Sequence, residues 1–193
     1  MKLQGSSLIL LITAVSLASA VYVMESQQRT NQAIKQQARK SLFVLQESEV
    51  QGLTLDTSNQ SLVFQKTQAG DSAQWRMVAP QAGPAEAGTI AFLLNLMATG
   101  ESQQTFKITQ GRRAEFGFDR PLAMNKVMLA DQQAVILVVG KPTFDRGALY
   151  ALVNPAEQPN QDLTVHLVSI NFENAVTRPL TEWQKQDASP KKK

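Results

Sequence analysis

The sequence predicts an α+β protein, in which an N-terminal transmembrane helix and a polar stalk precede mostly antiparallel sheets with two or three short helices. Three observations lead to this prediction. An apolar segment without charged side chains runs from Leu3 to Met24. Short apolar runs separated by turn-forming residues follow from Val50 onward, as expected of strands. Apolar residues recur at helical spacing between Ile90 and Met97. Many strand runs interrupted by few helices are typical of the α+β class.

Residues 1–24 are predicted to form a transmembrane anchor. A spanning helix needs about 20 apolar residues, and residues 6–24 supply this length for contact with a lipid bilayer. Tyr22 stands at the interfacial position that aromatic residues favour. The alternative is a signal peptide cleaved after Ala20, because Ala18-Ser19-Ala20 satisfies the small-residue cleavage rule. The apolar run continues to Met24, and this favours a retained anchor.

Residues 25–42 are predicted to form a polar helical stalk, because residues 26–42 lack Gly and Pro and are rich in Gln, Lys, Arg and Ala. Four basic residues oppose Glu25 in this flank, so a positive-inside count places it in the cytoplasm. A short basic head before an apolar segment is, however, recognised for export, and large domains translocate regardless of charge. We therefore expect a single-pass membrane protein with a cytoplasmic N-terminus and its domain outside the cytoplasm, either periplasmic or lumenal.

A single α+β domain is predicted over residues 43–184, and it begins with three strands. These are expected around Val50–Leu55, Leu62–Phe64 and Gln74–Val78, where turn-forming residues separate the apolar runs. A helix is expected to begin near Glu86 or Thr89 and to end at Gly100. Its buried face would consist of Ile90, Leu93, Leu94 and Met97.

The second half of the domain is predicted to contain five strands and two helical segments. The strands are Thr105–Ile108 at an edge, Lys126–Leu129 and Ala134–Val139 as a hairpin, Ala148–Val153, and Leu163–Val168. One helical turn is expected over Arg112–Phe116, because Gly117 can take the positive φ that ends it. A last helix is expected from Ser169 or Ile170 to Thr177, since Pro179 prevents its continuation.

Composition excludes several function classes. The chain has no cysteine, so disulfides, thiolate metal sites and cysteine nucleophiles are excluded. The net charge of +3 equals the contribution of Lys191, Lys192 and Lys193, which belong to a basic tail predicted to be disordered over residues 185–193. A domain with balanced charge lacks the basic surface that phosphate-backbone binding requires. Nucleic acid is therefore not expected as a partner.

Two motifs suggest chemistry, and each has a simpler structural interpretation. Val139-Gly140-Lys141-Pro142 is similar to the end of a phosphate-binding loop, but that loop needs Gly at position 135 and Ser or Thr at position 142. The chain has Val135 and Pro142 there, so a strand-ending turn is expected. His166 is the single histidine and lies in an alternating strand, without the partners that a metal site or a Ser-His-Asp triad requires.

Charged residues could line a cleft at two places. Glu115, Asp119 and Arg120 form one group, and Asp145 and Arg146 form the other. Acid–base catalysis needs carboxylates that meet in space, which sequence spacing does not establish, so solvated loop charges are expected. No catalytic, cofactor-binding or metal-binding residue is predicted, and we expect a protein without a cofactor that is not an enzyme.

Several short segments of the domain occur in the order seen in a known family. Trp75 stands five residues before Pro80, and a helix start at Ala85-Glu86 follows. Glu115-Phe116-Gly117-Phe118-Asp119-Arg120-Pro121 and Val138-Val139-Gly140-Lys141-Pro142 come later. In these segments the chain resembles the domain-of-unknown-function family "forty-three forty", over residues 43–183. That family includes auxiliary subunits of gliding-motility-type ABC transporters and related membrane-anchored proteins, so the resemblance implies an accessory role.

Three function classes are consistent with these observations. The first is a non-enzymatic, membrane-anchored accessory or adaptor protein. Its extracytoplasmic domain would bind a protein partner, such as an ABC-type transporter or another membrane complex. The second is an assembly or stability factor for a membrane protein complex. The third is an envelope hydrolase or ligand-binding module, which would need a polar pocket around His166. The apolar N-terminus, the stalk and the family resemblance favour the first class.

Overall fold

The structure is a computed structural model that describes residues 41–69, 72–155 and 161–186. The predicted anchor, the stalk up to Lys40 and the end of the basic tail lie outside the described residues. Ser41 and Leu42, which the sequence assigned to the stalk, belong to the folded unit, because Leu42 is buried and its N–H donates to the Gly100 carbonyl (2.9 Å). No helix within these ranges combines the length and the apolarity needed to cross a membrane.

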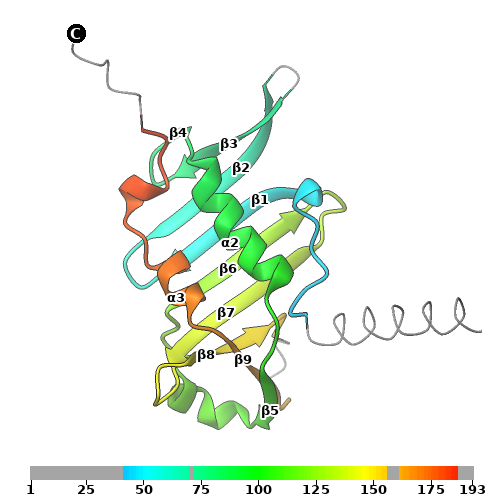
Figure 1. Cartoon of the computed structure of the whole chain (residues 1–193), viewed down its shortest axis with the longest axis vertical. Helices are drawn as coiled ribbons and strands as arrows, with labels where there is room; N and C mark the ends of the chain where they lie inside the picture. Colours follow the sequence, from blue (N-terminus) through cyan, green and yellow to red (C-terminus); the bar gives the residue numbers. More distant parts are fainter. Residues whose placement is uncertain (1–40, 70–71, 156–160, 187–193) are drawn as a thin grey trace, which may run out of the picture. The chain divides into compact units, whose positions relative to one another are not determined.

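Within the described residues, one nine-stranded antiparallel sheet forms the framework of the domain (Figure 1). Its strand order is β4-β3-β2-β1-β6-β7-β8-β9-β5. The first five strands in the chain are β1 Val50–Thr57, β2 Ser61–Ala69, β3 Ser72–Ala79, β4 Gly83–Pro84 and β5 Gln104–Ile108. The other four are β6 Ala123–Leu129, β7 Ala134–Pro142, β8 Ala148–Val153 and β9 Leu163–Ser169.

Two α-helices and three short 3₁₀-helices accompany the sheet in the described part of the chain. The α-helices are α2 Ala87–Thr99 and α3 Asn171–Val176, and the 3₁₀-helices are η1 Glu47–Glu49, η2 Gln110–Phe116 and η3 Leu180–Glu182. The predicted bounds of α2 are confirmed: Glu86 caps its start by accepting a hydrogen bond from the Gly88 N–H (3.2 Å), and Gly100 follows its last residue.

Two antiparallel meanders meet at the centre of the sheet, where β1 pairs with β6. Leu53 lies opposite Val127 in this pair, and Leu55 lies opposite Asn125. Apart from β4, each meander follows the strand runs that the sequence predicted. The pairing between them is a long-range contact, and local periodicity carries no information about it. The connection from β4 through α2 to β5 then takes the chain from one edge of the sheet to the other.

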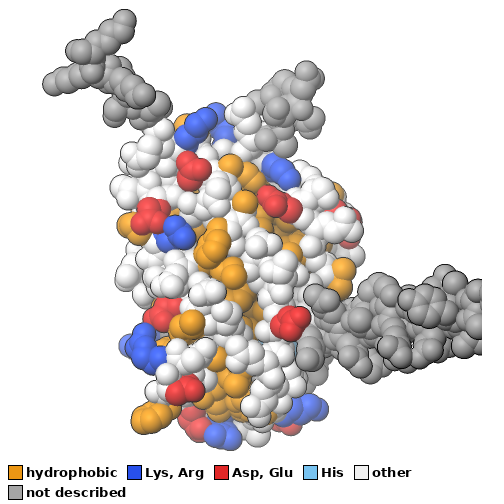
Figure 2. Space-filling model, in the orientation of Figure 1, with side chains coloured by type: hydrophobic (Ala, Val, Ile, Leu, Met, Phe, Trp, Pro, Cys, Tyr) orange, Lys and Arg blue, Asp and Glu red, His pale blue; other side chains and the backbone are white. Residues whose placement is uncertain are grey.

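The main core lies between one face of the sheet and the helices. The four predicted core residues of α2 are all buried, at 0–1% exposure. Phe64 of β2 and Trp183, just after η3, pack with their ring centroids 5.4 Å apart. α2 runs across the strands on this face (Figure 1), and it contains no charged residue. Figure 2 shows hydrophobic side chains reaching the surface along this helix, and Phe92 is 39% exposed.

The structure corrects one local prediction and adds one strand. Gly140, Lys141 and Pro142 do not form a turn. They continue β7, in which Pro142 lies opposite Leu149 after a register shift. The short strand β4 was not among the predicted strands. It lies at an edge of the sheet, which is where Pro84, without an N–H to donate, can be accommodated.

Candidate interaction surface

The chain itself covers the second face of the sheet over β7, β8, β9 and β5. Phe116 and Phe118, from η2 and the residues after it, pack there against a second apolar cluster. The buried members of this cluster are Ile108, Phe118, Val138, Leu152, Leu163 and Val165, and Phe106, Phe116, Ile136 and Tyr150 surround them. Half of the second face is thus part of the core.

Two glycines allow this covering segment to approach the sheet closely. Gly117 ends η2 with φ +81°, and a Cβ added there would lie 2.7 Å from the Lys141 backbone nitrogen. A Cβ added at Gly140 would overlap the Phe116 carbonyl oxygen and lie 2.9 Å from a ring carbon of Phe118. The two segments that carry most of the family resemblance therefore pack directly on each other. This close contact explains why both segments contain a glycine, at positions 117 and 140.

The aromatic rings in this region contact one another at several angles. The Phe116 and Tyr150 rings meet edge to face, with centroids 4.9 Å apart, and Phe106 lies 5.5 Å from Phe116. Edge-to-face pairs of this kind add about 0.5–1.5 kcal/mol each beyond their area of burial. The cluster stabilises the position of η2 on the sheet.

Strands β3, β2, β1 and β6 present their second face without a comparable cover from the described residues. We call this surface the open half-face and define it by Thr54, Val63, Gln65, Arg76, Met124, Lys126 and Met128. Strand alternation places these residues opposite the main core. Met124 is 40% exposed, Gln65, Arg76 and Lys126 are exposed, and the others are partly exposed.

A hollow of about 370 Å³ interrupts the open half-face at Gly52. Gln65 on β2 and Met128 on β6 are the cross-strand neighbours of this glycine. Gly52 leaves a gap between them because it has no side chain. A Cβ added there would lie 3.4 Å from the Phe64 carbonyl oxygen and 3.7 Å from the Met128 Cβ, both ordinary contact distances.

The open half-face carries more basic than acidic character. Arg76 and Lys126 have no ion-pair partner among the described residues. Asp56, opposite Met124 on the same face, accepts a hydrogen bond from the Ser61 hydroxyl. Two unpaired cations beside flexible methionine side chains suit an adaptable protein contact, since methionine fits irregular partner surfaces.

His166 lies in β9 with its ring half-buried, on the face opposite the second cluster. Its Nδ1 is 3.2 Å from the Ser102 Oγ, and that hydroxyl donates its proton to the Gln104 carbonyl (3.1 Å). While that hydroxyl donates to the Gln104 carbonyl, the contact uses the Nδ1–H tautomer of His166, which donates to the Ser102 Oγ. Burial lowers the pKa of His166 and favours the neutral ring.

The first charged group is divided between two surface ion pairs. Arg112 binds Glu115 at 2.6 Å, and Arg113 lies 3.6 Å from Asp119, while Arg120 is exposed. The hydrogen bond from Arg112 lowers the pKa of the Glu115 carboxyl. These carboxylates are each paired with a cation on the surface and do not form a cleft.

The second charged group stabilises a turn. The Thr143 hydroxyl (2.6 Å) and the Gly147 N–H (3.1 Å) both donate to the Asp145 carboxylate and lower its pKa. Arg146 takes the left-handed conformation, with φ 55°, and its side chain lies 3.3 Å from Glu173. Within the described ranges, no group of three acidic or histidine side chains could hold a metal ion.

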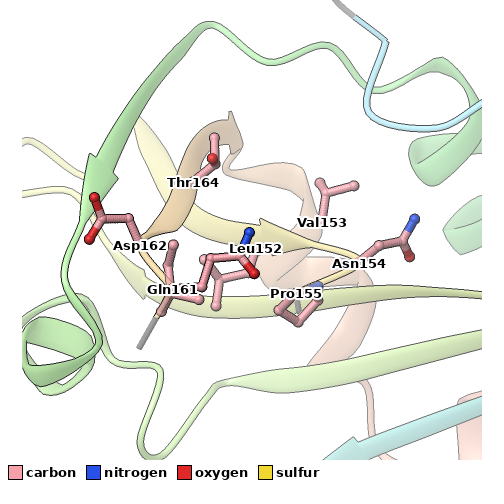
Figure 3. A pocket seen from close by; sticks show the side chains of 8 residues that line it. Leu152, Val153, Asn154, Pro155, Gln161, Asp162 and Thr164 are labelled. Carbon is pink, nitrogen blue, oxygen red and sulfur yellow. The ribbon is translucent and has the colours of Figure 1, made fainter. Parts of the chain in front are cut away.

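A smaller hollow of about 170 Å³ lies between the end of β8 and the start of β9 (Figure 3). Leu152, Asn154, Asp162 and Thr164 are among its lining residues. The Asn154 side-chain oxygen accepts a hydrogen bond from the Ile136 N–H of β7 (2.7 Å), so this amide links the end of β8 to the neighbouring strand. Residues 156–160, in the connection from β8 to β9, lie outside the described part of the chain.

Sequence analysis did not identify Gly52, Arg76 or Lys126 as candidate surface residues. Two signals could have done so. A glycine in the middle of a strand run is unusual, and polar or flexible residues alternate with apolar ones from Ala123 to Leu129. Both signals identify a strand face. Neither shows that the face is left without a cover.

The fold and this surface define the class of protein as an antiparallel α+β domain with half of one sheet face uncovered by its described residues. The chain belongs to the family described as Domain of unknown function (DUF4340), whose family model matches residues 75–189. The predicted family is thereby confirmed. The matched range includes both η2 and the Gly140 segment, and it begins at Trp75 of β3. Neither the curated proteins nor the solved structures gave a match to this chain.

Proposed function

We propose that this protein is a membrane-anchored accessory protein whose domain binds a protein partner outside the cytoplasm. The open half-face is the single observation that carries the proposal. It offers partly exposed methionine and valine side chains beside two unpaired cations on a rigid sheet. Small-molecule sites are usually concave and enclose most of their ligand, whereas a broad pleated surface suits contact with another protein.

Membrane attachment comes from the apolar N-terminus. Residues 6–24 match the length of a spanning helix, and the polar stalk behind them would hold the domain away from the bilayer. The family resemblance supports a membrane complex, such as an ABC-type transporter, as the partner. In this proposal the protein contributes binding and positioning to that complex and performs no reaction of its own.

Membrane fractionation and protease accessibility test the anchor and the orientation. Alkaline carbonate should leave the full-length protein in the membrane fraction, and protease added to spheroplasts should degrade residues 43–183. Release by carbonate would contradict the anchor. Full protection from protease in intact spheroplasts, with degradation after detergent is added, would place the domain in the cytoplasm. Affinity purification after in-cell crosslinking should recover a membrane protein, and recovery of no protein at all would contradict the adaptor role.

A further inference from the structure

We propose that the open half-face binds one amphipathic helix of the partner. An aliphatic side chain of that helix would fill the hollow at Gly52, and a carboxylate would lie beside each of Arg76 and Lys126. The inference rests on the proposed function, and it specifies which surface is used and what chemistry the partner presents.

The fold itself does not require glycine at position 52. A glycine within a strand is less stable than a residue with a side chain, because it loses more conformational freedom on folding. Gly52 does not have positive φ, and a Cβ there would make only ordinary contacts with Phe64 and Met128. Strand glycines mark β-bulges as well as sites where a ligand or another chain approaches closely. The register of β1 against β6 does shift between Val50 and Gly52. Because Gly52 does not have positive φ, this bulge does not itself require glycine, and an approaching partner supplies a reason for the missing side chain.

The two cations are separated by a distance that matches three turns of a helix. Arg76, Gln65, Gly52 and Met128 lie opposite one another on four neighbouring strands, and Lys126 is two residues from Met128. Strands about 4.8 Å apart, with about 3.4 Å per residue, place the Arg76 and Lys126 Cα atoms roughly 16 Å apart. A helix rises 1.5 Å per residue, so about 11 residues, or three turns, span this distance. Carboxylates about 11 residues apart would lie on one side of such a helix.

The position of the hollow agrees with that geometry. Gly52 lies between the two cations, two strands from Arg76 and one strand from Lys126. A helix that placed its carboxylates at the cations would therefore place its middle turn over the hollow. On the other face of the same sheet, α2 also runs across the strands (Figure 1), so a helix that crosses this sheet has a precedent within the domain.

Two other occupants fit the surface less well. Binding to an anionic bilayer normally uses clusters of about 4–8 basic residues, whereas this surface has Arg76 and Lys126 together with the acidic Asp56. In a symmetric contact between two copies, each copy would use the same surface patch. The predominantly basic surfaces would then face each other, and like charges across an interface disfavour association.

Site-specific photocrosslinking of the full-length protein in its own membrane tests the proposal. The probe is p-benzoylphenylalanine, placed either at Gln65 on the open half-face or at Asn95 on the exposed side of α2. Both side chains are exposed. Mass spectrometry should identify a crosslink from position 65 to an amphipathic helix with acidic residues about 11 positions apart. Position 95 should give at least about tenfold less of that product, because a crosslinker reacts only with groups that it contacts.

Two sets of variants examine the mechanism. Gly52→Val should lower the crosslink yield from position 65 about tenfold, because the added side chain fills the hollow. Gly83→Val is the matched control, since Gly83 is another strand glycine and has no atom near its Cβ position. Arg76→Glu with Lys126→Glu should also lower the yield about tenfold, while Lys107→Glu on exposed β5 should not. Tryptophan fluorescence should show that every variant remains folded.

The remaining outcomes separate the inference from the proposed function. A partner crosslinked only from position 95 would leave the adaptor role intact and overturn the use of the open half-face. Crosslinks from position 65 to lipid or to a second copy of the chain would overturn the choice of occupant. An unchanged yield in Gly52→Val would refute insertion into the hollow. The absence of protein crosslinks from both positions would contradict the proposed function together with the inference.

Discussion

Asn125 provides the most direct test of the energetics of this fold. Its side chain is fully buried on the core side of β6, between Leu55 on β1 and Leu137 on β7. Neither its Oδ1 nor its Nδ2 has a hydrogen-bond partner among the described residues. A buried amide without protein partners is costly, because burial removes it from bulk water. Asn125→Val replaces it with an apolar side chain suited to a strand.

The expected effect is an increase of about 2 kcal/mol in the free energy of unfolding. An unsatisfied buried polar group costs about 1–3 kcal/mol, and the β-propensity scale, which spans about 1 kcal/mol, favours Val over Asn. Urea denaturation of the full chain measures this change. Both tryptophans of the chain, Trp75 and Trp183, are buried in the domain and report its unfolding. With an m-value of about 2 kcal/mol/M, the midpoint should rise by about 1 M.

A less stable Asn125→Val variant would refute this reasoning, because it would show that the native amide makes hydrogen bonds worth more than its burial costs. Asn125→Asp is the informative companion. It places a carboxylate of similar size at a buried site without a cation, so at neutral pH it should destabilise the domain by about 3 kcal/mol or more. That loss should shrink when the pH is lowered and the carboxyl becomes protonated.

Two further predictions concern packing and pH. Gly140→Ala should destabilise the domain by about 3 kcal/mol, because the new Cβ would overlap the backbone carbonyl oxygen of Phe116. Gly111→Ala is the control: its Cβ would meet open space, so it should change stability by less than about 0.5 kcal/mol. Equal effects of the two substitutions would contradict the close contact at Gly140. Burial lowers the pKa of His166 from 6.5 in the folded protein, so the unfolded chain binds a proton first as the pH falls. The free energy of unfolding should therefore decline below about pH 6.5 and level off below the folded-state pKa. His166→Gln should remove this component of the urea-midpoint pH profile, and an unchanged profile would show that another group causes it.

The sequence predicted the individual elements well because each depends on local physics. The spacing of Ile90, Leu93, Leu94 and Met97 determines which side of α2 is buried, and Gly100 ends the helix as expected. Gly117 takes the positive φ that its position after a helical turn suggested. The same local reasoning failed at Gly140–Pro142. Proline near a glycine usually favours a turn, but pairing with β8 and packing under Phe118 extend the strand instead.

The candidate surface could not be predicted from the sequence. Alternation along β6 shows that Met124, Lys126 and Met128 share a face, but it does not show whether another segment covers that face. The cover at the other end of the sheet comes from η2, which follows directly after β5. It lies over this part of the sheet because β5 pairs with β9. Likewise, His166 and Ser102 come together because β5 pairs with β9, a contact between distant segments.

The sequence by itself determined the α+β class, the bounds of most elements, the family, and the apolar N-terminus that suggests a membrane protein. Each of these follows from composition, periodicity or short motifs, which act within a few turns or strands of the chain. Only the tertiary structure decided that the two meanders form one sheet and that the segments around Gly117 and Gly140 pack on each other. It alone also showed that half of one sheet face lacks a cover from the described residues. The physical reason is that burial depends on which distant segments meet, and every segment encodes only its own side of that contact.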